Sequence, residues 1–104
     1  MKRGDLVKLT IDYARPYPAM VLQADAFDQH RSVVVLPLTH EIHDTPLFRI
    51  SVPANEQTGL TQMAQIMVDK PTTIARSKLG YRTGQIDAHT LHAVEEALRG
   101  FLGL

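Results

Sequence analysis

The sequence predicts an α+β fold, mainly β: a small antiparallel sheet or SH3-like barrel with a C-terminal amphipathic helix. Short apolar segments with strand-like patterns occupy most of the chain before Asp87. Turn-forming residues separate these segments. A helical period appears only after Asp87. This order, with strands first and a helix last, is typical of an antiparallel sheet covered by one helix.

The strands are identified by their apolar patterns. Residues 6–11 alternate between apolar and polar side chains, which indicates a strand with one buried face. Residues 32–38 are almost continuously β-branched or aliphatic and predict a central strand buried on both faces. Further strands are expected at residues 19–24, 46–52 and 63–70. The strand at 63–70 is expected to continue over residues 72–74 after a bend at Pro71.

Loops and one helix account for the other residues. Residues 12–17 contain Arg15-Pro16, and proline restricts both its own backbone and that of the residue before it, so a loop is expected. Asp87 is positioned as a helix N-cap. Polar segments predict surface connections at 25–31, 39–45 and 53–59, and a single helical turn is expected at 75–79. The predicted helix has one apolar face, made of Leu91, Val94, Ala97, Leu98, Phe101 and Leu102.

Length and composition limit the possible functions. The 104 residues suit one domain spanning 1–104, and so small a core favours a homodimer. Lys and Arg (11) balance Asp and Glu (11), so any affinity for nucleic acid must come from a local patch. The absence of cysteine excludes disulfides and thiolate metal sites and suits the cytoplasm. No segment approaches the length of a membrane span, so no membrane association is expected.

A series of short motifs runs along the chain. The chain opens with Arg3-Gly4-Asp5, then has Pro18-Ala19 before an apolar segment and Pro37-Leu38-Thr39 at the end of the next one. Later motifs are Phe48-Arg49-Ile50, Gly59-Leu60, Asp69-Lys70, Thr73-Ile74, Leu79-Gly80 and Gly103-Leu104. In their order and spacing, these motifs resemble those of the MazF/PemK family of toxin endoribonucleases. The family usually carries arginine directly before the Pro-Ala dipeptide, where this chain has Tyr17.

The resemblance implies a homodimeric toxin of a type II toxin–antitoxin system with a CcdB/MazF-like fold. It implies a metal-independent endoribonuclease that needs no cofactor. Such an enzyme cleaves single-stranded RNA by attack of the 2′-hydroxyl on phosphorus and leaves a 2′,3′-cyclic phosphate. It also implies a cognate antitoxin protein whose acidic and apolar segment covers the RNA groove.

The family's two catalytic positions match this chain only in part. The threonine corresponds to Thr39, but the arginine corresponds to Tyr17. Arg15 lies in the same short loop and is the nearest replacement, since guanidinium binds phosphate through two parallel hydrogen bonds. We therefore expect Arg15 and Thr39 to be catalytic. Tyr17 could stack on a base or donate to phosphate, and Arg49 could contact phosphate or be an ordinary solvated strand residue.

Three other polar residues are candidates for catalysis or RNA binding. His40 could supply acid–base chemistry, because imidazole titrates near neutrality, or it could belong to a solvated loop. Gln65 could read a base or be a polar residue that points outward from its strand. Asp69 corresponds to an acidic position proposed to contribute in some family members; alternatively it is a strand-end carboxylate paired with Lys70 or Arg76.

Two alternative functions remain open. Tyr17 in place of arginine is consistent with a catalytically impaired member that acts as a binding module for RNA or antitoxin. A CcdB-like toxin that acts on a protein target is the other alternative. That branch relies on a C-terminus containing Trp, and this chain has no Trp, which disfavours it.

Overall fold

The computed structural model describes residues 1–10 and 15–104. Within these residues the chain forms seven strands, two short 3-10 turns at Asp25–Phe27 and Arg76–Lys78, and one α-helix. In chain order the strands are β1 (Asp5–Leu9), β2 (Tyr17–Val21), β3 (Ser32–Thr39), β4 (Arg49–Val52), β5 (Ala64–Met67), β6 (Thr72–Ala75) and β7 (Leu79–Gln85), and the helix α1 (Ala88–Leu102) follows them.

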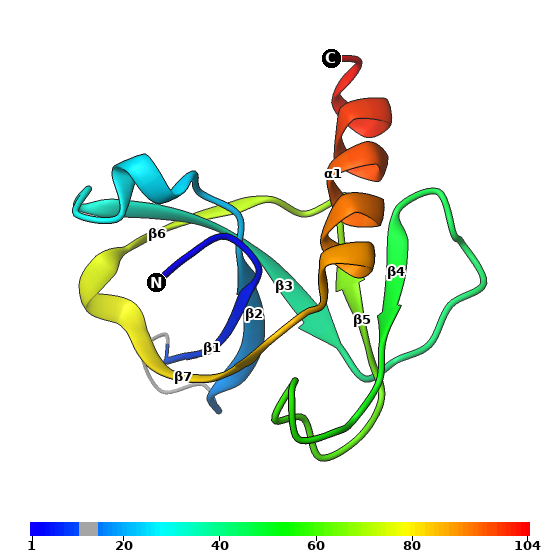
Figure 1. Ribbon diagram of the computed structural model, residues 1–104, viewed down its shortest axis with the longest axis horizontal. Helices are drawn as coiled ribbons and strands as arrows, with labels where there is room; N and C mark the ends of the chain where they lie inside the picture. Colours follow the sequence, from blue (N-terminus) through cyan, green and yellow to red (C-terminus); the bar gives the residue numbers. More distant parts are fainter. Residues whose placement is uncertain (11–14) are drawn as a thin grey trace.

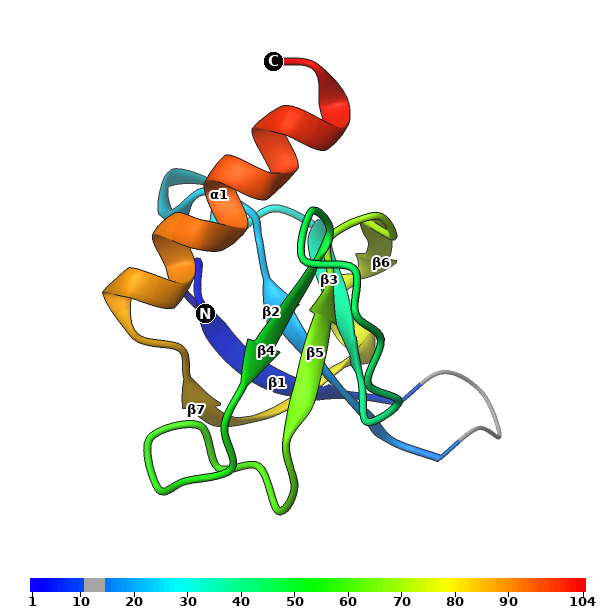
Figure 2. The ribbon, with the colours of Figure 1, turned by 90° about the vertical axis from the view of Figure 1, so that its right-hand side faces the viewer.

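β3 is the central strand of an antiparallel sheet with the order β4-β5-β3-β2-β1-β7. One edge of β3 pairs with β2, and its other edge pairs first with β6 and then, at its C-terminal end, with β5. In Figure 1 the strands β1, β2, β3, β6 and β7 curve into a ring, and β4, β5 and α1 lie beside it. Figure 2 shows β4 and β5 side by side, with β3 next to β5.

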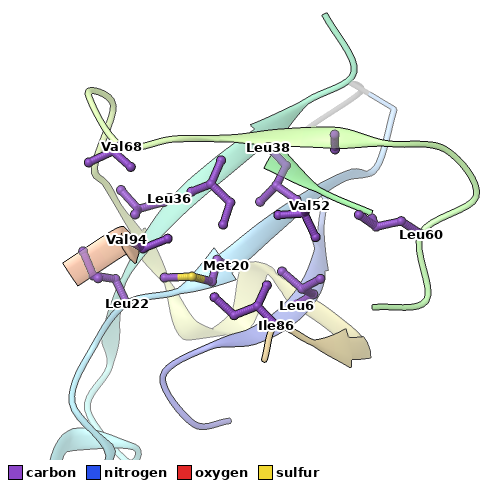
Figure 3. Close-up of a cluster of buried hydrophobic side chains, with 12 residues drawn as sticks. Leu6, Met20, Leu22, Leu36, Leu38, Val52, Leu60, Val68, Ile86 and Val94 are labelled. Atoms are coloured by element: carbon purple, nitrogen blue, oxygen red, sulfur yellow. The ribbon is translucent and has the colours of Figure 1, made fainter. Parts of the chain in front are cut away.

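The two faces of the sheet support two separate cores, because successive residues of a strand point to opposite faces. The first core lies between the sheet and α1 and contains Leu6, Met20, Leu36 and Val94, which Figure 3 labels. Ile66 also belongs to this core. The second core fills the ring and contains Val7, Leu9, Ala19, Val21, Val33, Val35 and Ile74. β1, β2 and β3 are therefore buried on both faces, as the sequence predicted for residues 32–38.

The opening motif Arg3-Gly4-Asp5 has a structural role. The Arg3 Nε donates to the Leu22 carbonyl oxygen at 2.7 Å, and its Nη1 lies 3.1 Å from a carboxylate oxygen of Glu95 in α1. The Asp5 carboxylate lies 3.1 Å from Nε of Arg82 in β7. The motif therefore ties the helix and the last strand to the start of the sheet.

The predicted fold class is confirmed, and the bounds of several elements are corrected. The strand expected at 19–24 is β2, which begins at Tyr17 because Tyr17 pairs with Leu9 of β1, so Tyr17 does not belong to the preceding loop. Residues 11–14, which include parts of the first expected strand and of that loop, lie outside the described residues. The strands expected at 46–52 and 63–70 are shorter, since the β4–β5 ladder runs only from Arg49↔Met67 to Val52↔Ala64.

β7 was not predicted, because two glycines interrupt its apolar pattern. These two glycines, Gly80 and Gly84, allow close packing: a Cβ atom on Gly80 would lie 2.6 Å from the carbonyl oxygen of Lys8, and one on Gly84 would lie 2.2 Å from that of Gln57. In the connection that faces β7, a Cβ atom on Gly59 would lie 2.2 Å from the carbonyl oxygen of Thr83. Gly59 also has a φ of +69°, which disfavours other residues. The connection after β4 therefore packs its backbone directly against β7.

We expect Gly84→Ala to destabilise the fold, because the new methyl group would collide with backbone atoms that cannot move independently. The expected loss in the free energy of unfolding is about 1–3 kcal/mol. Gly100→Ala is the matched control, since a Cβ there meets nothing within 4 Å and alanine favours helix by up to about 1 kcal/mol. Urea unfolding of both variants measures the difference, and equal stabilities would contradict the close packing.

α1 begins as predicted, with Asp87 as its N-cap. A carboxylate oxygen of Asp87 accepts a hydrogen bond from the backbone N–H of Thr90 at 2.7 Å. This hydrogen bond lowers the pKa of the Asp87 carboxyl, because it stabilises the ionised form.

A lowered pKa in the folded state predicts a pH dependence of stability. The contribution of Asp87 is complete above the pKa of the carboxyl in the unfolded chain and is lost as the pH falls through the lower pKa of the folded chain. Asp87→Asn caps a helix about equally well but does not titrate. We expect the wild type to lose stability relative to Asp87→Asn between about pH 5 and pH 2. Urea unfolding at several pH values tests this, and parallel pH profiles would contradict it.

Candidate active site

Tyr17 and Thr39 lie at the same end of two neighbouring strands. The β2–β3 ladder pairs Val21 with Val35 and Ala19 with Pro37, so the same register, continued by two residues, places Tyr17 opposite Thr39. Residues opposite each other in an antiparallel pair present their side chains on the same face. Both side chains are half-buried, and Tyr17 packs against the second core. The position before Pro18-Ala19 is therefore next to Thr39.

The same face continues across β5 and β4. Thr39 pairs with Gln65, and Gln65 pairs with Ser51, so these side chains lie on the face opposite the first core. Arg49 is two residues before Ser51 in β4 and shares this face. We call this surface, made of Tyr17, Thr39, Gln65, Ser51 and Arg49, the Thr39 face. Ser51 was not a sequence candidate, although its alternation with Arg49 was a signal for it.

The Thr39 hydroxyl has a defined hydrogen-bond arrangement. Its Oγ1 accepts a hydrogen bond from the backbone N–H of Glu41 at 3.1 Å. A hydroxyl that accepts a bond still has its own hydrogen to donate. Thr39 can therefore act as an oriented donor to a ligand at the end of β3.

Gln65 is buried, with 4% of its surface exposed, so it does not point outward into solvent. Its Oε1 accepts from the backbone N–H of His43 at 2.9 Å, and its Nε2 donates to the His43 carbonyl oxygen at 2.9 Å. The carboxamide therefore binds the backbone of the loop that follows β3. We call this pair of hydrogen bonds the Gln65–His43 bridge.

His40 is exposed, and its ring is fixed through one nitrogen. Nδ1 lies 3.1 Å from the carbonyl oxygen of Met63. A carbonyl only accepts, so Nδ1 carries the hydrogen in this contact and Nε2 of the neutral ring carries the lone pair. Nearby, Nε2 of His43 lies 3.9 Å from the exposed Glu41 carboxylate. In the described part of the chain, no group of His, Asp and Glu side chains has the arrangement of a metal site.

Arg49 and Asp69 form an ion pair at the far side of the Thr39 face. Arg49 Nε lies 3.3 Å from Asp69 Oδ1, and Nη2 lies 3.5 Å from Oδ2, with side chains only 12% and 19% exposed. The alternatives in which Arg49 is an ordinary solvated residue and Asp69 pairs with Lys70 or Arg76 are therefore wrong. The reason is the pairing of Arg49 with Met67, which places Arg49 beside the end of β5.

Arg15 lies two residues before β2 and is exposed. A residue before proline favours extended backbone, in which side chains two residues apart point to the same side. This geometry would direct Arg15 to the side of the strand that carries Tyr17.

The Thr39 face is separate from a cavity of about 430 Å³ that lies beside α1, where Leu22, Val34 and Leu98 line it. Within the described ranges, the structure contains no helix with the length and apolarity that crossing a membrane requires.

Comparison with known proteins identifies close relatives over the full length. The family model described as PemK-like, MazF-like toxin of type II toxin–antitoxin system matches residues 2–102. A probable endoribonuclease MazF of Mycolicibacterium smegmatis is 36% identical over 107 residues, which cover 100% of this chain and 98% of the relative.

Solved structures show the same fold at lower identity. The Mycobacterium tuberculosis toxin MazF-mt6 matches with a TM-score of 0.84 and 24% identity, over 96% of this chain and 97% of that one. The MazE–MazF complex of Deinococcus radiodurans matches with a TM-score of 0.84 and 23% identity, over 100% and 97%. A mycobacterial endoribonuclease in complex with its cognate antitoxin matches with a TM-score of 0.80 and 24% identity, over 100% and 96%.

The expected toxin function and kinship to endoribonucleases are thus confirmed at the level of the family. The chain belongs to the PemK-like, MazF-like toxins of type II toxin–antitoxin systems.

Proposed function

We propose that this toxin is an endoribonuclease that cleaves single-stranded RNA without a metal, at the end of the Thr39 face where Tyr17 and Thr39 meet. The β2–β3 register is the observation that carries the proposal, because it makes the residue before Pro18-Ala19 a neighbour of Thr39. The family resemblance implies arginine and threonine at these two positions. The fold thus keeps these two positions side by side, but the first of them carries Tyr17 in place of arginine.

The proposed reaction is an internal transesterification. The 2′-oxygen attacks phosphorus, the bond from phosphorus to the 5′-oxygen breaks, and a 2′,3′-cyclic phosphate and a 5′-hydroxyl result. The 2′-hydroxyl loses its proton, the departing 5′-oxygen gains one, and the phosphate oxygens need donors for their increasing negative charge. Thr39 is suited to be one of these donors, because its hydroxyl is oriented by the Glu41 N–H.

Arg15 supplies the positive charge in this proposal. A guanidinium remains ionised and binds two phosphate oxygens at once. Tyr17, anchored against the second core, provides a phenol hydroxyl for a further hydrogen bond or a ring on which a base can stack. His40 is the candidate proton acceptor, because its bond to Met63 leaves the Nε2 lone pair of the neutral ring for a proton.

The assembly and the partners are part of the proposal. We infer a single domain that acts as a homodimer in the cytoplasm, where RNA is available, with a cognate antitoxin as its partner. The small core of a 104-residue chain supports the dimer. The lack of cysteine supports the cytoplasm as the compartment. Two of the structurally similar toxins were solved together with an antitoxin, which supports a partner of that kind.

A second candidate function is a catalytically impaired toxin that binds RNA or antitoxin without cleaving RNA. Tyr17 favours it, because tyrosine is neutral where the family pattern has a cation. RNA binding without cleavage by the wild-type protein would distinguish this candidate from the enzyme.

We expect Thr39→Ala and Arg15→Ala each to reduce the rate of RNA cleavage about 100-fold, because each removes a donor to the reacting phosphate. The measurement is cleavage of a labelled RNA oligonucleotide in the presence of a metal chelator. Thr73→Ala, an exposed substitution on β6, is the matched control and should leave the rate unchanged. Unchanged cleavage in both Thr39→Ala and Arg15→Ala would rule out this site.

We expect the Arg49–Asp69 pair to matter for stability rather than for chemistry. Asp69→Ala leaves a largely buried guanidinium without its partner and should cost about 3 kcal/mol in the free energy of unfolding. The double variant Arg49→Met, Asp69→Leu removes both charges and should recover most of this loss. Urea unfolding measures the stabilities, and RNA cleavage per folded molecule measures the activity. A severe loss of cleavage by fully folded Asp69→Asn would instead assign the carboxylate a role in the reaction.

A further inference from the structure

We propose that Gln65 is a positioning residue: through the Gln65–His43 bridge it fixes the loop of residues 40–44 beside Thr39, and this loop selects the nucleotide that flanks the scissile phosphate. The inference deepens the proposed function and rests on it. It concerns recognition of the RNA sequence rather than the cleavage step.

The bridge is a complete two-point contact to one residue. Oε1 and Nε2 of Gln65 bind the N–H and the C=O of His43, both at 2.9 Å, as a neighbouring strand would. The side chain is almost fully buried, and breaking such a bond leaves buried polar groups unsatisfied. Gln65 therefore holds the loop backbone in one place and is not itself free to read a base.

Two further hydrogen bonds fix the beginning of the same loop. The Glu41 N–H donates to Thr39 Oγ1 at 3.1 Å, and the His40 ring binds the carbonyl oxygen of Met63. Because β3 pairs with β5 through Thr39 and Gln65, these anchors all lie at the shared end of the two strands. The loop position and the orientation of the Thr39 hydroxyl are consequently linked.

The loop presents exposed side chains from this fixed backbone. The side chains of Glu41 and His43 are 84% and 52% exposed, and Ile42 is 54% exposed. A carboxylate accepts hydrogen bonds from base amino groups, imidazole can bond or stack, and isoleucine offers an apolar contact. These are contacts to bases, whereas a carboxylate repels phosphate. The loop is therefore suited to read the base next to the phosphate that Thr39 binds.

The test compares Gln65→Met and Gln65→Glu with the wild type. Methionine removes both hydrogen bonds at similar volume, and glutamate keeps the acceptor for His43 N–H but repels its carbonyl oxygen. Gln57→Met, an exposed substitution beyond β4, is the matched control. Thermal unfolding establishes that each variant is folded, and Gln65→Glu serves if Gln65→Met does not fold.

Two readouts separate positioning from a general structural effect. Hydrogen exchange of the His43 amide, followed by NMR, should become at least about tenfold faster in the Gln65 variants. The ratio of affinities and of cleavage rates between RNA oligonucleotides that differ only in the flanking base, at fixed salt, should change about threefold or more. Such a ratio does not depend on the fraction of folded protein.

Each outcome decides the proposal. Unchanged exchange at His43 would overturn the bridge, and faster exchange with unchanged base preference would overturn the role in selection. Equal affinity of the wild type for every flanking base would also overturn it. If the wild type binds RNA with a base preference but does not cleave it, only the proposed ribonuclease activity is contradicted. The affinity ratios of the Gln65 variants then still test whether the loop of residues 40–44 selects the base.

Discussion

The register of β3 with its neighbours determines both the core and the site. A slip of β2 or β5 by one residue would reverse the faces of every side chain in that strand. It would move Met20 or Ile66 out of the first core, at a cost of about 1.5–3 kcal/mol for each side chain. The same slip would remove Tyr17 or Gln65 from the side of Thr39. The hydrophobic packing that stabilises the fold therefore also fixes the composition of the Thr39 face.

Buried polar contacts restrict which part of the Thr39 face a ligand can use. Gln65 binds the loop backbone, and Arg49 binds Asp69 next to β5. Both groups already have intramolecular partners, so a phosphate would have to compete with those partners in a poorly hydrated place. In the Arg49–Asp69 pair, Nη2 donates a hydrogen bond to Oδ2, whereas Nε and Oδ1 are buried and held only by the ion pair. The accessible donors are consequently concentrated at the β2–β3 end, and the part of the face on β4 and β5 supports this end.

Local patterns in the sequence predicted the features that depend on local order. The continuous apolar run of β3, the apolar stripe of α1 and the Asp87 cap are each visible within a few residues, and the family motifs indicated Thr39. Contacts between distant segments were not visible. β7 depends on the close contact of Gly84 with the connection after β4, and Asp69 pairs with a residue twenty positions away. The Gln65–His43 bridge similarly joins two segments whose proximity only the β3–β5 pairing creates.

The substitution at Tyr17 makes the source of positive charge the decisive question for the proposed chemistry. Most described arginines are committed elsewhere: Arg3 to Glu95, Arg49 to Asp69, Arg76 to backbone carbonyl groups, Arg82 to Asp5 and Arg99 to Glu96. Arg31 precedes β3 while Thr39 ends it, which separates them by about 25 Å along the strand. Arg15 is the arginine that extended geometry brings toward Tyr17 and Thr39. Arg15, in the segment before β2, would then neutralise the phosphate charge instead of a residue of the strand itself. Pro16 and the pairing of Tyr17 with Leu9 would set the direction of the Arg15 guanidinium.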